Sequence, residues 1–475
     1  MIEEKRYNKV VATLWPSIDK KWILKTIDKF VDVYRINLSH ADLTKTRWII
    51  KGIRDINAKK VFMLDTKWPE IRTTNTQEIE LVKNSIVKIY NKPIDWNISI
   101  NYEYFQNIST DIEISFNDRA AEWIVKENTW EYLEVELTSW WKIWFNKTVN
   151  FIWYEIELDF LTEKDKEDLK FMVEENIAIL AVSFIKSHRD IIRLKQYIKE
   201  KFNNYDTKII AKIETLSAVE DIENIIKYSD GIMIARWDLW ANMNIIDLPK
   251  IQKKIIKLCN MNWKPVILAT QVMSSMVLKA IPTRAEIDEI AYNIQHWVDT
   301  FMLSDETAIW NYPIETLSIL NDVIISYQKD VKELKFNWED INKYSDADNQ
   351  ITDYILYTAK KMASKLNVKL IITPTSTWYT PWKISALKPW IPILSFTNSD
   401  KVFKYCNLMF WVDSYKIWDN QISYEQLKKI IWETIQHKFR WDIKWEDKIL
   451  IAHSTIKQNI PSMINGIEVI KFKDL

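Results

Sequence analysis

The sequence is short of glycine. Its 475 residues include only 3 Gly, where the usual frequency of about 7% predicts roughly 33. Glycine normally fills the turns and helix ends that need a positive φ, so this chain lacks its usual turn formers. The same sequence contains 25 Trp, although Trp is normally among the scarcest residues.

The tryptophans occupy positions where a chain needs glycine. They precede prolines, interrupt polar stretches, or separate a helix-like run from an apolar run, as do Trp15, Trp68, Trp140, Trp141, Trp237, Trp240, Trp263 and Trp297. A bulky indole disfavours the positive φ of such turns. We therefore interpret most tryptophans as glycines: a reassigned codon, UGA in the simplest case, is read as Gly in the organism and has been translated as Trp in this sequence. The alternative is a truly Trp-rich protein with an aromatic binding surface, which would not need Trp at turns.

Cysteine, net charge and long apolar runs are also scarce. Cys259 and Cys406 are the only cysteines, and 65 basic residues balance 65 acidic residues. The two cysteines have no metal-site spacing, so we expect a reducing cytoplasm and no disulfide framework. The zero net charge favours neither nucleic acid nor an anionic membrane as a partner. The N-terminus has no signal-peptide pattern, and no apolar run is long enough to span a membrane.

Short apolar runs alternate with longer helical patterns through most of the chain. The eight strand-like runs are 9–14, 31–38, 59–66, 177–184, 208–214, 230–236, 264–270 and 298–304. Eight such units predict an α/β fold, a (β/α)8 TIM barrel. The interval after the third run alternates with period two, which predicts an inserted small β-barrel lid domain. We expect the catalytic barrel over 1–68 and 156–335, the lid over 69–155, and a C-terminal α/β regulatory domain over 345–475.

Charged residues cluster at the predicted ends of the barrel strands, where barrel enzymes build their active sites. Lys212 and Glu214 lie two apart in one strand and so face the same way. Glu214 and Asp238 come from adjacent strands and can share one Mg²⁺. With Arg35 and Arg72 as fixed positive charges, the set indicates phosphoryl transfer. A single charge at a strand end is more often structural, so the inference depends on the combination.

Two further patterns bear on phosphate binding. With glycine at Trp237 and Trp240, the segment ARWDLW becomes ARGDLG at a helix start, where backbone N–H groups could bind a carboxylate or phosphate. With glycine at Trp378 and Trp382, the segment 378–384 becomes GYTPGKI. That segment is one residue short of a P-loop and has Ile384 where Ser or Thr is required. No GxGxxG follows the first strand, so a Walker-type or Rossmann enzyme is not predicted.

The chain resembles the pyruvate kinase family over nearly its whole length. The matching segments include KVVATLWPS (9–17), YRINLSHAD (34–42), LDTKWPEIRT (64–73), IIAKIET (209–215), SDGIMIARWDLW (229–240), KPVILATQVMSSM (264–276) and MLSDETAIWNYPIET (302–316). The family has Gly at the tryptophans of ATLWPS, DTKWPE and ARWDLW and at the turns near 263, 297 and 310. The resemblance thus supports the recoding interpretation independently.

The resemblance implies transfer of the phosphoryl group of phosphoenolpyruvate to ADP, giving pyruvate and ATP in the last step of glycolysis. Lys212 would stabilise the transferring group, Arg35 and Arg72 would contact phosphate oxygens, and Glu214 and Asp238 would hold Mg²⁺ or Mn²⁺. Thr270, with the backbone of Trp237 and Asp238, would hold the substrate carboxylate and lie near the proton delivered to the enol. The implied nucleotide-binding residues are Arg35, Asn37, His40 and Lys147.

The resemblance further implies a K⁺ site, a mobile lid and a homotetramer. The K⁺ site corresponds to Asn37, Ser39, Asp65 and Thr66, and Glu70 is the acidic residue that accompanies K⁺ dependence. A possible effector loop contains Thr375, Ser376, Thr377 and Thr380. The loop over 453–465 departs from the family pattern, so allosteric control by a sugar phosphate is not implied.

Other departures concern single positions. Asp305 and Thr148 stand where the family has Gly. Seven tryptophans match no family Gly and are either genuine or at variable positions: Trp22, Trp48, Trp123, Trp130, Trp338, Trp432 and Trp441. If Trp15, Trp68, Trp237 and Trp240 are literal, the alternative is a catalytically inactive homologue that binds effectors or partners. A second alternative is a barrel enzyme that acts on phosphoenolpyruvate or a 2-keto acid without ADP.

Overall fold

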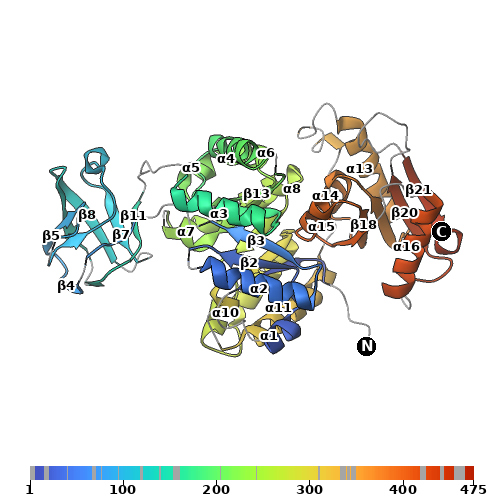
Figure 1. The fold of residues 1–475 in the computed structure, drawn as a ribbon, viewed down its shortest axis with the longest axis horizontal. Helices are drawn as coiled ribbons and strands as arrows, with labels where there is room; N and C mark the ends of the chain where they lie inside the picture. The colour runs from blue at the N-terminus through green and yellow to red at the C-terminus, as the bar shows by residue number, and fades with distance from the viewer. Residues whose placement is uncertain are drawn as a thin grey trace.

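The computed structural model describes residues 6–14, 21–39, 41–66, 71–75, 77–94, 96–117, 121–138, 141–152, 161–203, 205–241, 243–308, 311–331, 338–339, 343, 349–417, 424–438, 443–453 and 466–475. The described parts form three bodies in a row (Figure 1). A small β domain lies at one end, a closed barrel in the middle and an α/β domain at the other end. Within the described residues, no helix has both the length and the apolar character needed to cross a membrane.

Eight parallel strands close into the predicted barrel. They are β1 (Lys9–Leu14), β2 (Val33–Asn37), β3 (Val61–Asp65), β12 (Ile179–Val182), β13 (Lys208–Ile213), β14 (Gly231–Ala235), β15 (Val266–Ala269) and β16 (Thr300–Leu303). The closed order is β1-β16-β15-β14-β13-β12-β3-β2. These strands are mostly apolar because helices cover the outside of the sheet while side chains fill its inside.

Helices surround the barrel. They are α1 (Lys21–Ile27), α2 (Leu43–Ile56), α3 (Glu163–Glu174), α4 (His188–Lys201), α5 (Leu216–Glu220), α6 (Ile222–Tyr228), α7 (Arg236–Ala241), α8 (Leu248–Met261), α9 (Arg284–Gln295), α10 (Asp305–Ala308) and α11 (Pro313–Tyr327), with 3-10 turns η3 (Ser274–Val277) and η4 (Gln328–Asp330). Capping boxes begin α3, with Thr162 and Asp165, and α9, with Thr283 and Glu286. These caps satisfy N–H groups that a helix start leaves unpaired.

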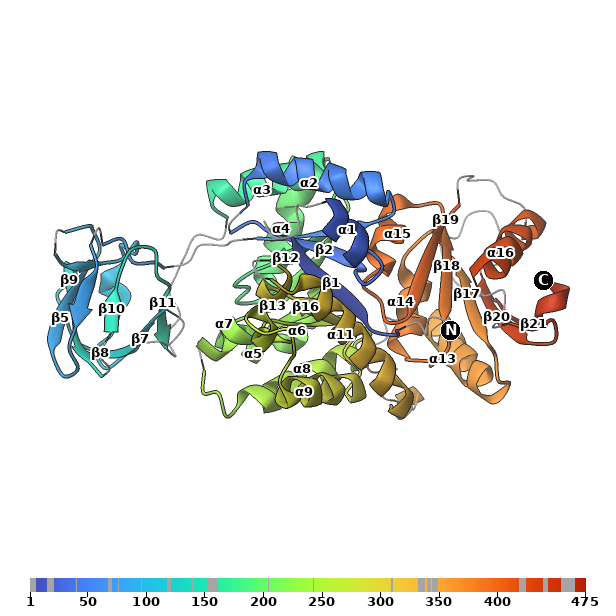
Figure 2. The same ribbon diagram turned by 90° about the horizontal axis from the view of Figure 1, so that it is seen from below.

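The insertion between β3 and β12 is all β, as predicted. Its elements are β4 (Ile79–Leu81), β5 (Ile86–Tyr90), β6 (Ile98–Ser99), η2 (Phe105–Asn107), β7 (Glu113–Phe116), β8 (Ala121–Asn128), β9 (Tyr132–Leu137), β10 (Trp141–Ile143) and β11 (Val149–Ile152). Its described strands form a six-stranded sheet, β11-β7-β8-β9-β5-β6, and a separate pair, β10-β4. Figure 2 shows this domain beyond the barrel end that carries α5 and α7.

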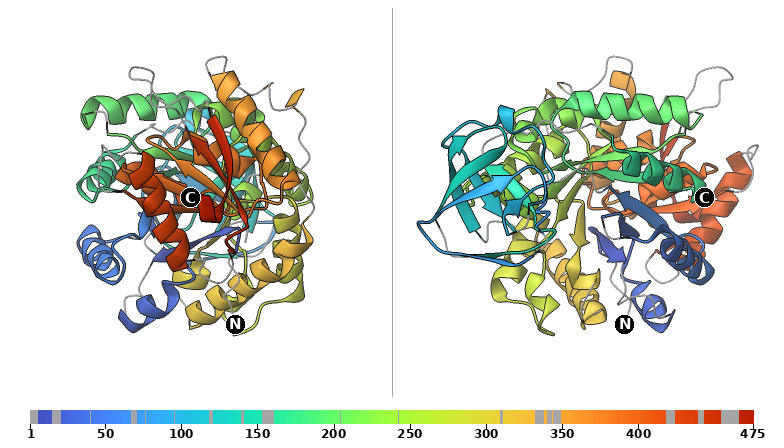
Figure 3. Two further views of the ribbon diagram at one scale, coloured as in Figure 1. Left: turned by 90° about the vertical axis from the view of Figure 1, so that its right-hand side faces the viewer. Right: turned by 60° about the vertical axis from the view of Figure 1, so that its left-hand side comes forward.

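The C-terminal domain packs at the opposite end of the barrel (Figure 2). It contains α13 (Gln350–Lys365), β17 (Leu370–Pro374), α14 (Tyr379–Ala386), β18 (Ile393–Thr397), α15 (Asp400–Cys406), β19 (Val412–Lys416), α16 (Tyr424–Lys438), β20 (Lys448–His453), β21 (Gly466–Lys471) and η6 (Phe472–Asp474). Helices cover both faces of its sheet (Figure 3). In β17, Ile371 packs with the barrel-side core while Leu370 and Ile372 pack with α16, as strand alternation requires.

Candidate active site

Lys212 is the centre of a buried polar cluster inside the barrel. Its ammonium lies 2.8 Å from Glu214 Oε1 and 3.1 Å from Asp65 Oδ1. It also donates a 2.7 Å hydrogen bond to Ser183 Oγ. Strand β13 places Lys212 and Glu214 on one side because they are two residues apart. The sequence prediction that these two side chains lie together is confirmed.

Asp65 links this lysine to an arginine. Its Oδ2 is 2.6 Å from Arg35 Nε, and Arg35 Nη1 donates to Thr13 Oγ1 at 3.0 Å. Burial alone raises the pKa of Asp65, but Arg35 and Lys212 outweigh it and hold that pKa below its usual value. Burial lowers the pKa of Lys212, but Asp65, Glu214 and Asp238 hold it above its usual value. The cluster therefore keeps Lys212 charged near neutral pH.

The two predicted magnesium ligands lie at the ends of neighbouring strands. Glu214 is 1% exposed, and its Oε2 accepts the Phe184 N–H at 2.5 Å. Asp238 lies in the first turn of α7, directly after β14, and its charge acts on Lys212. These oxygens suit the chemistry of Mg²⁺ or Mn²⁺. Among the described residues, no group of three or more His, Cys, Asp or Glu side chains is arranged to hold a metal.

The substrate-binding prediction concerns the start of α7. Thr270 has a φ of 61°, and its hydroxyl oxygen accepts the Trp237 N–H at 3.0 Å. The Trp237 indole packs edge to face with Trp240, with ring centroids 5.0 Å apart. Glycine at positions 237 and 240 would remove both rings from the start of α7.

The predicted potassium ligands come from two adjacent strands. Asn37 and Asp65 are paired across β2 and β3, and the Ser39 N–H donates to Asn37 Oδ1 at 3.2 Å. Thr66 follows Asp65 and is buried. These four residues supply only oxygen atoms as potential ligands, a donor set that suits a hard cation.

The remaining nucleotide and phosphate residues belong to the inserted domain. Arg72 donates to Asn146 O at 2.9 Å and forms a bridge with Thr148. The Lys147 ammonium lies 4.3 Å from the centroid of the Trp144 ring. Arg72 and Lys147 are therefore neighbours of each other on the lid rather than members of the Lys212 cluster.

Several predicted positions lie outside the described residues. They are His40, Glu70, Trp15, Trp68, Trp140, Trp310, Trp441 and the loop over 454–465. The proposed effector residues follow β17, in the domain packed at the other end of the barrel. There Thr375 Oγ1 accepts the Thr377 N–H at 3.2 Å, Ser376 lies between them, and Thr380 is buried in α14.

Three residues that complete the cluster were not predicted from the sequence. Ser183 and Phe184 end the fourth strand-like run, and Thr13 is the next-to-last residue of the first. A hydroxyl residue near the end of an apolar run was the available signal in the sequence. Arg236, which the sequence left without a role, donates to Thr270 O and pairs with Glu289. Burial lowers the pKa of Arg236 despite the carboxylates near it.

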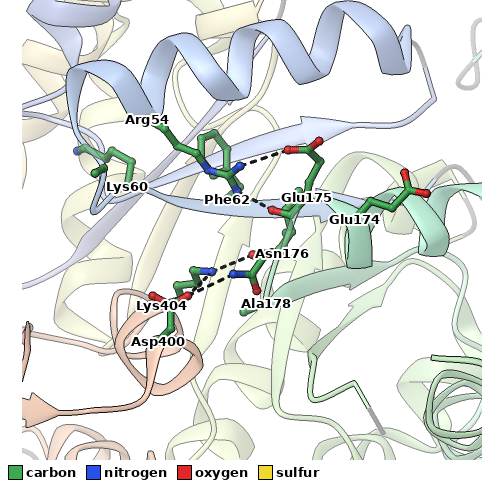
Figure 4. Close-up of a pocket in the computed structure, with 11 residues that line it drawn as sticks. Arg54, Lys60, Phe62, Glu174, Glu175, Asn176, Ala178, Asp400 and Lys404 are labelled. Carbon is green, nitrogen blue, oxygen red and sulfur yellow. Dashed lines mark hydrogen bonds and ion pairs between the residues drawn. The ribbon is translucent and has the colours of Figure 1, made fainter. Parts of the chain in front are cut away.

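One cavity lies away from this cluster, between the barrel and the C-terminal domain (Figure 4). Its volume is about 250 Å³, and its wall includes α2, the turn after α3, and α15. Arg54 Nη2 donates to Glu175 O at 2.6 Å, and Lys404 Nζ donates to Asn176 O at 2.8 Å. Arg54 bonds within the barrel, whereas Lys404 of the C-terminal domain bonds to Asn176 of the barrel, so the cavity is part of a domain joint.

Comparisons with known proteins agree with this geometry. The family model described as pyruvate kinase, barrel domain, matches residues 5–317, and the one described as pyruvate kinase, alpha/beta domain, matches residues 353–470. Pyruvate kinase of Thermotoga maritima is 32% identical over 85% of this chain and 87% of its own length. That of Clostridium perfringens is 33% identical over 86% and 88%. The crystal structure of a pyruvate kinase from Cryptosporidium parvum has a TM-score of 0.90 at 25% identity, covering 98% of this chain and 96% of its own.

Proposed function

The chain belongs to the pyruvate kinase family, and we propose that it transfers the phosphoryl group of phosphoenolpyruvate to ADP, giving pyruvate and ATP. The observation that carries the proposal is the position of Lys212. Its ammonium lies between Asp65 and Glu214 inside the barrel. Nothing in these findings favours an inactive homologue.

Lys212 and Arg35 supply fixed positive charge where a phosphoryl group in transfer carries negative charge. Both are buried and held by Asp65, so they need little reorganisation during the reaction. Glu214 and Asp238 would hold Mg²⁺ or Mn²⁺. When bound, that ion neutralises charge on phosphate oxygens.

Substrate orientation falls to the first turn of α7 and to Thr270. We propose that Thr270 and the backbone of residues 237 and 238 hold the substrate carboxylate. That position would also place Thr270 near the enol carbon when it accepts a proton.

The inserted domain supplies the nucleotide side of the site. Arg72 and Lys147 would reach phosphate oxygens when the lid closes, together with Arg35, Asn37 and His40. Lid closure excludes water, which would otherwise compete with ADP for the phosphoryl group. Asn37, Ser39, Asp65 and Thr66 would hold K⁺, with Glu70 as the residue that accompanies it.

Family membership also supports proposals for the domain bounds, the oligomeric state and the effector loop. We place the barrel at 1–68 and 156–335, the lid at 69–155 and the C-terminal domain at 345–475. Family membership supports a homotetramer, which light scattering would test. The effector role of Thr375, Ser376, Thr377 and Thr380 is tested by phosphate-dependent changes in activity.

The decisive assay measures pyruvate formed from phosphoenolpyruvate with and without ADP. We expect strict dependence on ADP, and pyruvate formation without ADP would favour the second alternative enzyme.

Lys212→Met should lower kcat/KM at least about 10³-fold, because it removes the central charge. Lys208→Met is the matched control, since Lys208 begins the same strand at its other end. Equal activity of the Lys212→Met variant and its parent would contradict the assignment.

A further inference from the structure

Six tryptophans adopt a backbone conformation that suits glycine. Positive φ values occur at Trp96 (65°), Trp130 (72°), Trp263 (63°), Trp297 (62°), Trp390 (54°) and Trp411 (51°). In the described residues, no glycine has a positive φ. Seven of the other eleven positive-φ residues are Asn or Asp, the side chains that tolerate this conformation best. Trp has no such tolerance, so its abundance here needs a separate explanation.

The ends of four helices provide an internal comparison. After α8, the Lys264 N–H donates to Cys259 O, and after α9 the Val298 N–H donates to Asn293 O. This six-to-one bond defines a Schellman motif, whose left-handed position is usually Gly and sometimes Asn. In these two helices that position is Trp263 or Trp297.

The other two helices show the same motif with asparagine, a residue that commonly adopts the left-handed conformation. After α3, the Ile177 N–H donates to Met172 O at 2.9 Å, and the left-handed residue is Asn176. After α13, the Val368 N–H donates to Ala363 O at 3.0 Å, and the left-handed residue is Asn367. One motif therefore uses Asn twice and Trp twice within one chain.

Hydrogen bonding gives no reason for tryptophan at these positions, although Trp263 is buried in the core and Trp390 and Trp411 pack against Tyr7. Among the described residues, the buried indole N–H groups of Trp263, Trp297, Trp390 and Trp411 have no hydrogen-bond partner. Buried tryptophans usually find one. Trp96 and Trp130 are instead 74% and 69% exposed.

We infer that the protein made by its source organism has glycine at positions 96, 130, 263, 297, 390 and 411. Position 130 is one that the family resemblance left open. Trp48 in the interior of α2 and Trp123 in β8 have no positive φ and are not included.

Peptide mass spectrometry of the protein purified from its source organism decides the inference. We expect glycine at all six positions. Tryptophan at position 263 or 297 would overturn it, because these two positions have the clearest helix-end geometry.

Thermal melting of the chain as printed gives a separate test. Trp96→Gly and Trp130→Gly should each raise Tm by about 2–4 °C, because glycine relieves the positive φ at an exposed site. Trp48→Gly is the matched control, since Trp48 is 70% exposed but lies in a helix interior, where glycine should lower Tm. Equal losses of Tm in all three variants would count against the backbone argument.

A second inference comes from the hydrogen bonds of Ser183. Its hydroxyl donates to Thr66 O at 2.8 Å and accepts from Lys212 Nζ at 2.7 Å. Its N–H donates to Thr66 Oγ1 at 3.2 Å. Ser183 is 3% exposed, so water does not readily replace these bonds.

Ser183 completes the surroundings of the lysine. An ammonium group has three N–H donors, and those of Lys212 have acceptors in Asp65, Glu214 and Ser183. The two carboxylates attract the ammonium toward themselves. The neutral Ser183 oxygen accepts the third N–H of the Lys212 ammonium, and the hydrogen bonds to Thr66 fix the position of that oxygen.

We propose that Ser183 is a positioning residue for Lys212, an inference that rests on the proposed function. Ser183→Ala should lower kcat about tenfold or more while changing KM for phosphoenolpyruvate less than about threefold, since the substrate contacts remain. Ser183→Thr keeps the hydroxyl and should recover most of the activity. The parent for these variants is the chain that carries the residues found by mass spectrometry at the six tryptophan positions.

The outcomes separate the two proposals. A parent without ADP-dependent pyruvate formation contradicts the proposed function. An active parent with an equally active Ser183→Ala variant contradicts the role of Ser183, as does a Ser183→Thr variant as impaired as Ser183→Ala. Should Ser183→Ala not fold, Ser183→Cys provides a near-isosteric weak acceptor that should also lower kcat.

Discussion

At the scale of single residues, the site depends on charges that stabilise one another. Asp65 is 1% exposed and serves two cations, Arg35 and Lys212. Each of these charges would be unfavourable in the interior alone. Their arrangement explains how a barrel interior can hold a lysine that stays charged.

Asp65→Asn should destabilise the protein by about 3 kcal/mol, because it leaves two buried cations without their shared partner. The pKa of Asp65 is lowered in the folded protein. Its contribution is therefore complete above its unfolded pKa of about 4 and lost as pH falls through the folded pKa. Urea unfolding from pH 3 to 8 measures the free energy of unfolding of parent and variant. The difference between these two free energies should shrink as the pH falls below about 4.

Asp206→Asn is the control for that experiment. Asp206 pairs with Lys208, but its side chain is 52% exposed, so its loss should cost less than about 1 kcal/mol. An equal loss of stability in both variants would mean that burial does not determine how much each ion pair contributes to the free energy of unfolding.

At the scale of elements, helix ends position the loops that carry the site. Thr283 and Glu286 form the capping box of α9. Glu286 also accepts bonds from the Ser275 N–H and hydroxyl, 2.8 and 2.5 Å long. One carboxylate therefore connects the helix start to η3, which follows Thr270 along the chain.

Glu286→Ala should cost about 2 kcal/mol, since both the capping bond and the loop bonds are lost. Hydrogen exchange should become faster at residues 274–277 as well as at the start of α9. Thr162→Ala removes the corresponding cap of α3 and should cost about 1 kcal/mol without affecting that loop. Unchanged exchange at 274–277 would contradict the connection.

At the scale of the whole molecule, a buried ion pair joins the barrel to the C-terminal domain. Lys388 is fully buried, pairs with Asp299, and lies 4.4 Å from the centroid of the Phe410 ring. Burial raises the pKa of Asp299 and lowers that of Lys388. The pair therefore links two domains through charges that depend on each other.

Lys388→Met should destabilise the protein by about 3–5 kcal/mol, because it leaves a buried carboxylate unpaired. The double variant Lys388→Met with Asp299→Asn should recover a substantial part of that loss. Urea unfolding of the parent, the two single variants and the double variant gives the coupling free energy between Lys388 and Asp299. A purely additive double variant would contradict a direct interaction.

The sequence predicted the barrel, the all-β insertion and the pairing of Lys212 with Glu214. These depend on local patterns, since apolar runs predict buried strands and a two-residue spacing predicts a shared side. It missed the contacts of Ser183, Thr13 and Glu289. Those contacts join residues from different strands and helices, which spacing along the chain does not encode.

The glycine deficit shows the same division at the level of backbone conformation. The sequence by itself determined that tryptophans stand where turns need glycine, because composition and neighbouring residues reveal that. The sequence already indicated Trp263 and Trp297, and only the tertiary structure added Trp96, Trp130, Trp390 and Trp411, because φ at a loop position depends on how the fold closes around it. In the same way, the sequence determined the strand ends that carry the polar residues, and barrel closure decided that Asp65, Ser183 and Glu214 surround one ammonium.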